Sequence, residues 1–434
     1  MFIVSKVSTN QDVFIVDGAR TPFLKNTGVP GPFTASDLAV QATRPLLARQ
    51  PFAASVLDEV IMGCIMPSPD EANIARIIAL RLGCGDKVPA WTVQRNCGSG
   101  MQSIDCAVSN IRSGRSHLVL AGGTESMSHA PLMFNQNFAN WLGRFSAAKS
   151  FRDKLTQVIR FRPGMLSPVI ALLRGLTDPV VGLNMGQTAE VLAYRFKISR
   201  KLMDDYAARS HQRLAAAQAE GRMSEIETLY DTRGKFYNFD SGVRTDSTAE
   251  KLAKLKPVFD RDFGNVTAGN SSQITDGAAL VILASEQAVQ KYKLPVLGRI
   301  IDSQWSALMP QQMGLGPVHA MTPIMQRQKL AIQDVDYWEI NEAFAAQVLA
   351  CVAAWNDDDY CRNELNLDGA FGLLDQEKLN VDGGAVALGH PVGTSGARIV
   401  LHLCQVLAQK KVHRGMAAIC IGGGQGGAML IERD

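Results

Sequence analysis

The feature that most constrains this chain is an internal repeat, because two distant stretches show similar local features in the same order. Leu57 to Met62, L-D-E-V-I-M, resembles Val335 to Ile340, V-D-Y-W-E-I. A turn of small residues opens a helix near Gly98 and again near Thr394. The apolar run L-V-L-A-G-G follows the first turn, and A-A-I-C-I-G-G-G follows the second. This shared order predicts two homologous halves, which a single-repeat fold would not need.

Within the first half, short apolar runs alternate with helical patterns. We expect strands at 13–16, 59–64 and 90–94, and a fourth that closes at Gly123. Helices are expected after Ser36 as an N-cap, at 72–82, and from the Gly98 turn to about Ile111. Alternation of this kind predicts an α/β fold with a largely parallel sheet.

A different, mostly helical and polar region separates the two halves. The expected division is 1–125 with 264–293 for the first half, 126–263 for a loop domain, and 294–434 for the second half. Inside the loop domain, Trp141 to Leu176 interleaves seven Lys and Arg residues with apolar ones, opposed only by Asp153. This basic amphipathic pattern fits a helical hairpin packed on its own domain with a solvated basic face. It fits an interaction surface equally well.

The composition excludes several classes of protein. The formal net charge of +3 is too small to predict nucleic-acid binding, although a small positive excess suits an anionic ligand. The eight cysteines form no C-x-x-C pair, so we expect a reducing compartment without a disulfide framework or a metal site. The N-terminus lacks the pattern of a signal or transit peptide, and no apolar stretch is long enough to span a bilayer. These features predict a cytoplasmic protein.

Cys97 is the strongest candidate for chemistry. It lies in Q-R-N-C-G-S-G, between an expected strand and an expected helix. The helix dipole and free N–H groups at such a position favour a thiolate, which is a good nucleophile for a carbonyl. A cysteine is equally often a small buried side chain, so this turn alone leaves both interpretations open.

Two further glycine-rich turns carry candidate groups. His390 lies in D-G-G-A-V-A-L-G-H-P-V-G-T-S-G, at the repeat position that corresponds to the Cys97 turn. A lone histidine is usually structural, but this symmetry favours a base for Cys97 or a group that polarises a carbonyl. Cys420 ends an apolar run before Gly422 and its neighbouring glycines, whose N–H groups could form an oxyanion hole. Otherwise, Cys420 is a core cysteine before a sharp turn.

Two weaker stretches complete the set. Asn341 begins N-E-A-F-A, where it is either a helix N-cap or an amide that holds a water in an active site. The segment T-A-G-N-S-S, from Thr267, includes Ala268, Gly269 and Ser272. Its small side chains and hydroxyls suit an extended polar ligand, although such a segment also passes for a surface turn before a strand.

Together these blocks resemble the thiolase family. C-G-S-G, N-E-A-F-A, G-H-P-x-G-x-S-G-A-R and C-I-G-G-G-Q-G stand in that family's order and approximate spacing, and M-G-x-T-A-E and T-A-G-N agree as well. The resemblance extends from R-T-P-F at Arg20 to the C-terminus. It implies the thiolase fold, two homologous α/β halves in a five-layered α-β-α-β-α arrangement, with a mostly helical loop domain.

The resemblance also implies roles for individual residues. Cys97 would accept the acyl group, Cys420 would protonate or deprotonate the acetyl methyl carbon, and His390 would activate Cys97. With a water on Asn341, His390 would stabilise the thioester oxyanion, while the N–H groups of Cys97 and Gly422 would form a second oxyanion hole. Ser272 and Met313 match positions that line the coenzyme A site. Coenzyme A would be a substrate in a ping-pong reaction, with no metal or redox cofactor.

Two departures bear on the subfamily. Asn184 precedes M-G-x-T-A-E where many short-chain biosynthetic thiolases carry His, and Asn341 stands where trifunctional-enzyme β-subunits often carry His. The basic insertion at 141–176 nevertheless resembles the extended loop of those β-subunits, which implies contact with a membrane or a hydratase/dehydrogenase α-subunit. We expect a degradative 3-ketoacyl-CoA thiolase of fatty acid β-oxidation, with a short-chain acetyl-CoA C-acetyltransferase as the alternative.

The resemblance further implies a homodimer or a tetramer. A decarboxylating ketoacyl synthase is a remote alternative, against which the second cysteine, Cys420, argues. A catalytically silent CoA-ester or lipid-binding module is another, against which the joint presence of Cys97, Asn341, His390 and Cys420 argues.

Overall fold

The computed structural model describes residues 11–433. The N-terminal stretch that lacks the pattern of a signal or transit peptide lies outside the described residues. One long sheet path runs through both halves of the chain. The strands of the first half follow the order β1-β10-β5-β3-β4, with the short β2 pairing to β10, and those of the second half the order β12-β13-β14-β11. Their bounds are β1 Val13–Arg20, β2 Leu24–Lys25, β3 Glu59–Gly63, β4 Ala90–Val93, β5 Leu118–Ser126, β10 Thr275–Ser285, β11 Gly298–Ala307, β12 Tyr337–Ile340, β13 Arg414–Ile421 and β14 Gln425–Glu432.

The two halves repeat one strand order. When β2 and β4, which have no counterpart in the second half, are set aside, the first strand of each half (β1, β11) pairs with the last (β10, β14). The last strand pairs with the third (β5, β13), which pairs with the second (β3, β12). Only the β3–β5, β3–β4 and β12–β13 pairs are parallel. The expected largely parallel sheet is therefore wrong, because β10 and β14 run antiparallel to both of their main neighbours. The two halves join at the β1–β11 edge, where only two residue pairs are in register.

The repeat extends to individual side chains. Both first strands bulge at an aspartate, Asp17 in β1 and Asp302 in β11. An arginine at the end of the following covering helix binds each carboxylate: Arg49 Nε lies 2.7 Å from Asp17, and an Arg327 Nη lies 2.9 Å from Asp302. In both halves the next residue, a glutamine, donates to the same carboxylate. These matched contacts support homology of the halves more strongly than the letters of the sequence do.

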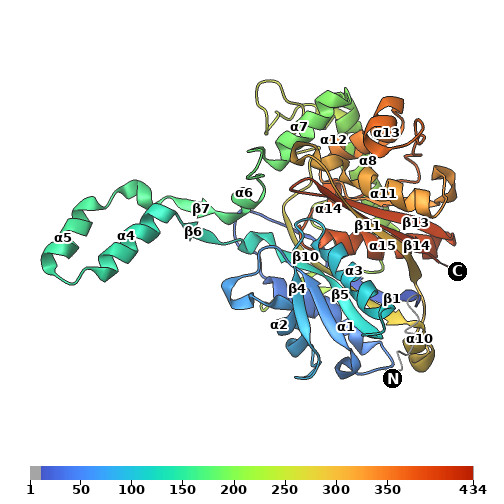
Figure 1. Cartoon of the computed structure of the whole chain (residues 1–434), viewed down its shortest axis with the longest axis horizontal. Helices are drawn as coiled ribbons and strands as arrows, with labels where there is room; N and C mark the ends of the chain where they lie inside the picture. Colours follow the sequence, from blue (N-terminus) through green and yellow to red (C-terminus); the bar gives the residue numbers. More distant parts are fainter. Residues whose placement is uncertain (1–10, 434) are drawn as a thin grey trace, which may run out of the picture.

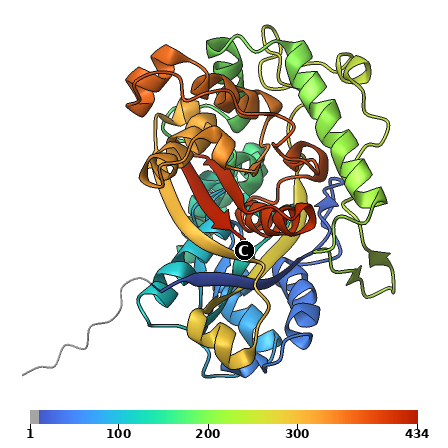
Figure 2. The same ribbon diagram turned by 90° about the vertical axis from the view of Figure 1, so that its right-hand side faces the viewer.

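Helices cover and separate the two halves of the sheet in five layers. One apolar core joins α1 and α2 to the first half, a second encloses α3 and α15 between the halves, and a third joins α11 and α12 to the second half. Figures 1 and 2 show the blue-to-cyan first half and the orange-to-red second half as two stacked blocks. The bounds are α1 Ala35–Ala48, α2 Ile74–Arg81, α3 Ser99–Arg112, α10 Glu286–Tyr292, α11 Gly316–Arg327, α12 Ala345–Trp355, α13 Asp358–Leu365, α14 Ala385–Leu388 and α15 Ser395–Lys410. The expected five-layered thiolase arrangement is confirmed.

The central helices α3 and α15 meet at a seam of glycines. A Cβ placed on Gly100 would lie 2.8 Å from the backbone N of Ala397, and one on Gly396 would lie 2.6 Å from the backbone N of Met101. Contacts that short do not admit a side chain, so only glycine lets the two helix N-termini approach this closely. The seam brings the turn before α3 beside the turn before α15.

The loop region follows β5 and includes an arm that projects from the body (Figure 1). A two-stranded stem, β6 paired with β7, carries a hairpin of α4 and α5. Trp141 of α4 holds the hairpin together, because its indole N–H donates to the Gln157 carbonyl of α5 at 2.8 Å and its ring packs edge-on against Phe161. Among the described residues this hairpin packs on itself and not on the rest of its domain, so the packed interpretation is wrong. The bounds are β6 Leu132–Phe134, α4 Gln136–Ala147, α5 Phe151–Arg160, β7 Pro168–Ile170, α6 Ala171–Gly175, α7 Met185–Arg195, α8 Arg200–Ala219, β8 Leu229–Tyr230, β9 Phe236–Tyr237 and α9 Ala249–Leu252.

Several local expectations hold and others shift. Thr34, not Ser36, caps α1: its hydroxyl accepts from the N–H of Asp37, whose carboxylate accepts from the Thr34 N–H in return. The first strand runs on to Arg20, because pairing with β10 extends it beyond its apolar start. All eight cysteines are free thiols. In the described part of the chain, no helix is long and apolar enough to cross a membrane.

Candidate active site

Cys97 lies in a strained turn between β4 and α3. The preceding residue, Asn96, has φ of 42°, a left-handed conformation that asparagine tolerates better than most side chains. Ser99 stabilises the turn, because its Oγ donates to the Asn96 carbonyl at 2.7 Å and accepts from the Arg95 N–H at 2.7 Å. The Asn96 amide then donates to the Gly422 carbonyl at 2.8 Å. The Cys97 turn is thus attached to the glycine turn of the second half.

The surroundings of the Cys97 sulfur act on its pKa in opposite directions. Burial is the largest influence and raises the pKa above its usual value, while the backbone N–H groups of Gly422 and of Cys97 itself lower it. The net direction is upward. The N–H groups at the helix start favour a thiolate, as the sequence predicts, but burial outweighs them. A nucleophilic Cys97 needs a base that takes its proton.

His390 has the free nitrogen that such a base requires. Its backbone N–H donates to the Gln273 carbonyl at 2.9 Å, and its Nδ1 lies 2.6 Å from the Ser395 hydroxyl. That hydroxyl can also donate to the Pro391 carbonyl at 3.3 Å, which leaves it free to accept from an Nδ1–H. Nε2 has no hydrogen-bond partner among residues 11–433. This arrangement favours a neutral ring with a lone pair on Nε2.

Burial lowers the pKa of His390 to about 4, so the ring is neutral near pH 7. In the unfolded chain its pKa is about 6.5, so between pH 6.5 and 4 the unfolded state binds more protons than the folded state. We expect the free energy of unfolding to fall by about 3 kcal/mol across this window because of His390. Chemical denaturation at several pH values, compared with His390→Gln, measures this contribution. Equal pH slopes in both proteins would contradict it.

Cys420 is the second thiol of the site. It lies near the end of β13 opposite Gly426 of β14, and its side chain is fully buried among protein atoms at the base of the cavity. Burial, and then the proximity of Cys97 and Cys351, raises the pKa of Cys420 well above its usual value. At neutral pH it is therefore a protonated thiol that is close enough to Cys97 for the two to interact electrostatically.

Asn341 does not cap a helix. The helix after it, α12, begins at Ala345 with Phe344 as its N-cap, so the capping interpretation is wrong. The backbone of Asn341 is used, because its N–H donates to the Ala418 carbonyl at 2.9 Å. Its side chain is fully buried, yet neither amide atom has a partner in the described part of the chain. Since buried amides are normally satisfied, this one is available for a water or a ligand.

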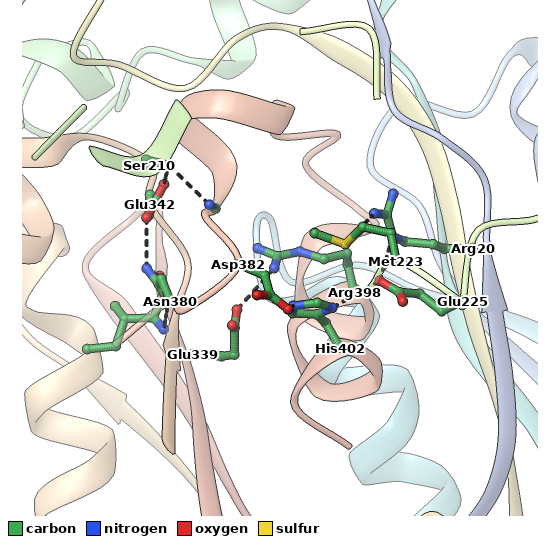
Figure 3. Close-up of polar contacts among 12 residues, drawn as sticks. Arg20, Ser210, Met223, Glu225, Glu339, Glu342, Asn380, Asp382, Arg398 and His402 are labelled. Atoms are coloured by element: carbon green, nitrogen blue, oxygen red, sulfur yellow. Dashed lines mark hydrogen bonds and ion pairs between the residues drawn. The ribbon is translucent and has the colours of Figure 1, made fainter. Parts of the chain in front are cut away.

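The neighbouring Glu342, which the sequence did not single out, connects the site's loops. It accepts hydrogen bonds from the Tyr206 hydroxyl at 2.9 Å, the Ser210 hydroxyl at 2.7 Å, the Asn380 amide at 3.0 Å and the Val386 N–H at 3.2 Å. Figure 3 shows this carboxylate between Ser210 of α8 and Asn380. The contacts hold the loop that leads to His390 against the loop that carries Asn341.

A second buried ionic network supports the same loop from the other side (Figure 3). His402 of α15 lies 3.0 Å from Glu225 and 3.4 Å from Asp382, which precedes the His390 turn. Arg20 of β1 lies 3.2 Å from the same Glu225, and Arg222 pairs with Asp382. Burial opposes ionisation of Glu225, but its contacts with His402 and Arg20 outweigh burial and lower the pKa of Glu225 to about 2. The network therefore connects both halves and the loop region beneath the site.

Glu125, at the end of β5, is a further residue that sequence reasoning missed. It accepts from the N–H groups of Ile65 at 2.9 Å, Met66 at 3.0 Å and Gly393 at 3.0 Å. Burial raises its pKa above the usual value, although these donors oppose that shift. Its contacts bring a loop of the first half against the turn that follows His390. No local pattern around Glu125 indicates this, because its partners are distant in sequence.

These groups converge on a cavity of about 710 Å³. Of the residues proposed from sequence, Cys97, His390, Cys420, Ser272, Met313 and Ala268 line it. Asn341, Gly422 and Gly269 are not among its lining residues in the described chain, and Gly269 instead donates its N–H to the Thr267 hydroxyl at 3.2 Å. Lining residues that the sequence did not single out include Lys25, Arg244, Leu173, Leu176, Met185, Phe259 and Phe344, and Asn184, noted above as a departure from short-chain thiolases, lines the cavity too. Within residues 11–433, no group of three or more His, Cys, Asp or Glu side chains could hold a metal ion.

Comparisons with known proteins agree with this arrangement. Residues 13–287 match the family model for the N-terminal domain of thiolase, and residues 294–433 match that for its C-terminal domain. The mitochondrial 3-ketoacyl-CoA thiolase of Homo sapiens is 39% identical over 97% of this chain and 98% of its own length. The mitochondrial trifunctional enzyme subunit β of Bos taurus is 34% identical over 97% of this chain and 88% of its own. A crystal structure of the human mitochondrial 3-ketoacyl-CoA thiolase in complex with CoA superimposes with a TM-score of 0.82 at 38% identity, covering 98% of both chains.

Proposed function

This chain belongs to the thiolase family, and we propose that it cleaves 3-ketoacyl-CoA substrates through an acyl-enzyme formed on Cys97. It is an acyltransferase that acts on acyl-CoA, with coenzyme A as a substrate. The observation that carries the proposal is that two thiols, Cys97 and Cys420, and a neutral histidine with an unpartnered Nε2 open onto one cavity. That combination provides a nucleophile, a base and a separate proton donor.

The first half-reaction begins with proton transfer from Cys97 to Nε2 of His390. Because the pKa of the thiol is raised and that of His390 is lowered to about 4, the transfer is unfavourable in the resting site. It therefore proceeds together with attack of the sulfur on the keto carbon, C3. The oxyanion that forms on C3 accepts from the N–H groups of Cys97 and Gly422, which already point at the sulfur.

Cleavage of the C2–C3 bond then leaves the acyl group on Cys97 and an acetyl-CoA enolate. The enolate oxygen accepts from the protonated His390 and from a water that the unpartnered Asn341 amide holds. Cys420 donates its proton to C2, which suits a thiol whose raised pKa keeps it protonated. Acetyl-CoA leaves, and a new coenzyme A thiol attacks the acyl-Cys97 thioester. Its proton passes to Cys420 and restores that thiol, while the Cys97 sulfur leaves the acyl group and takes back the proton held by His390, so the cycle is balanced.

We place the coenzyme A end of the substrate along Ala268, Ser272 and Met313. The cationic Lys25 and Arg244 line the same cavity and suit the phosphates of coenzyme A. We further propose that the protein works in the degradative direction, because relatives at 38–39% identity are named 3-ketoacyl-CoA thiolase. A thiolysis assay with coenzyme A and 3-ketoacyl-CoA substrates tests the function directly. Absence of CoA-dependent loss of the 3-ketoacyl-CoA absorbance, at every acyl length, would overturn it.

The arm has the features of a surface that binds anionic membranes. Residues 131–170 contain six Lys and Arg and one Asp, a net charge of +5 by that difference, while the whole chain carries only +3. On α5 the apolar residues Phe151, Leu155, Val158 and Ile159 follow helical spacing and are all exposed, Phe151 at 80%. An exposed apolar stripe flanked by cations is typical of helices that lie in a lipid headgroup layer.

Binding to vesicles tests this role of the arm. We expect the double variant Phe151→Ser/Ile159→Ser to bind vesicles of phosphatidylcholine and phosphatidylglycerol about 100-fold more weakly, since each apolar side chain contributes about 1.5 kcal/mol when buried. Phe263→Ser, at an equally exposed position outside the arm, is the control. Sedimentation with vesicles measures the difference. Equal binding by all three proteins would contradict the membrane role and leave a hydratase/dehydrogenase α-subunit as the partner to test.

We also propose that the protein is a homodimer or a tetramer. β4 is the outer strand of the first half and has no strand partner on its free edge in the described chain. Trp91, at the middle of β4, is partly exposed. Unpaired strand edges with exposed apolar residues are suited to pairing with a second copy.

A further inference from the structure

Part of the apolar lining of the cavity comes from the segment at which the arm joins the body. The Ala171 N–H donates to the Pro131 carbonyl at 3.1 Å and closes the stem, and α6 follows at once. Leu172 of α6 is buried against Met127 and Val392 in a small apolar cluster. Cys97 and Leu176 pack against the same cluster. The arm's root is therefore in contact with the nucleophile's immediate surroundings.

Two other leucines of this segment face the cavity. Leu173 and Leu176 both line it, and Leu173 is nevertheless 58% exposed. The Leu176 carbonyl accepts from the Met185 N–H at 3.0 Å, and a Cβ on Gly422 would lie 3.1 Å from the Met185 sulfur. Met185 thus connects the end of α6 to the turn at Gly422, whose N–H is proposed to bind the oxyanion. An exposed leucine beside a cavity stabilises an apolar ligand that covers it.

The cavity has both polar and apolar lining residues, and a thioester substrate likewise has a polar end and an apolar end. Ser271, Ser272, Lys25 and Arg244 suit the coenzyme A end, and the α6 cluster suits a hydrocarbon chain. With C3 at the Cys97 sulfur, the acyl carbons beyond C3 extend away from coenzyme A. Because the apolar α6 cluster packs against Cys97, it is the lining that these carbons can contact.

We propose that Leu173 and Leu176 form the wall against which the acyl chain beyond C3 packs, so that the site selects long 3-ketoacyl chains over acetoacetyl-CoA. This inference rests on the proposed thiolase function and adds its substrate class. Each methylene that leaves water favours binding about fourfold. The ratio of kcat/KM for 3-ketodecanoyl-CoA to that for acetoacetyl-CoA therefore measures the contact directly.

The test compares this ratio in three proteins. We expect Leu173→Asn to lower the ratio about tenfold, equivalent to the loss of contact with nearly two methylene groups. Leu373→Asn replaces a leucine that is also well exposed but does not line the cavity, and we expect it to leave the ratio unchanged. Because Leu173 is largely exposed, its replacement does not open the core.

A second variant tests the same wall by filling it. Leu176→Trp should shorten the space for the chain, so that activity on 3-ketodecanoyl-CoA falls at least about tenfold more than activity on acetoacetyl-CoA. A wild-type protein that cleaves both substrates, but whose ratio neither leucine variant changes, overturns the inference alone. An equal loss on both substrates in Leu173→Asn also overturns it. A wild-type protein that cleaves neither substrate overturns the proposed function itself.

Discussion

Cys97→Ala should lower the rate of 3-ketoacyl-CoA thiolysis by about four orders of magnitude or more. The sulfur is the atom to which the acyl group transfers, and alanine leaves no group that can form the intermediate. Neither His390 nor Cys420 can replace it in the same geometry, because one is held by Ser395 and the other lies deeper in β13. Steady-state thiolysis of acetoacetyl-CoA and of 3-ketodecanoyl-CoA measures the loss.

Mass spectrometry supplies the independent measurement. Wild-type protein mixed with acetoacetyl-CoA in the absence of free coenzyme A should gain an acetyl group on the peptide that contains Cys97. Cys106→Ala is the matched control, since Cys106 is a partly exposed thiol on the same helix, α3, but does not line the cavity. Acetylation of any other residue, or an equal loss of rate in Cys106→Ala, would contradict the assignment of the nucleophile.

Cys420→Ala should separate the two half-reactions. The variant keeps Cys97 and His390, so it should still form acetyl-enzyme from acetyl-CoA. It lacks the thiol that exchanges a proton with the acetyl methyl carbon, so we expect exchange of those protons in deuterated water to slow about 1,000-fold. Proton NMR of the acetyl-CoA methyl signal follows the exchange, and intact-protein mass follows the acetylation.

A buried cysteine close by provides the control for this variant. Cys351 of α12 is fully buried and near enough to affect the Cys420 pKa, and its own pKa is raised to about 12 by burial. It does not line the cavity, so Cys351→Ala should leave methyl-proton exchange close to the wild-type rate. Normal exchange in Cys420→Ala, or an equal loss in Cys351→Ala, would rule out Cys420 as the acid/base group.

The parts of the site that could be predicted from sequence are those with a local signature. Cys97, His390 and Cys420 each lie in a glycine-rich turn beside a strand or a helix. Such turns and strands are determined mainly by residues close together in the sequence, so they can be recognised from it. The repeat order then indicated that two of these turns correspond. The five-layered fold was predictable only through the resemblance of these blocks to thiolases, and the antiparallel course of β10 and β14 was not predictable, because pairing direction depends on long-range connections.

The parts that could not be predicted depend on contacts between distant residues. Glu125 binds a residue 268 positions away, and Glu342 joins α8 to the loop before His390. Asn341 looked like a helix cap because cap and site signatures coincide, and only the later start of α12 separates them. Ser395 was the one positioning residue with a usable signal, since it lies five residues after His390 within the same turn.

The glycine seam between α3 and α15 has a consequence for how such a protein can change. Gly100 and Gly396 each meet backbone atoms of the opposite helix, and a Cβ on Gly123 would lie against the carbonyl of Gly393. Not even a methyl group fits there, so these glycines, beside the turns that carry Cys97 and His390, do not admit substitution. Few such contacts surround the arm and α6, since α4 and α5 have no buried residues and α6 has only Leu172. Divergence toward other substrates, whether natural or engineered, therefore has to proceed through changes in α6 and the arm and not in the seam.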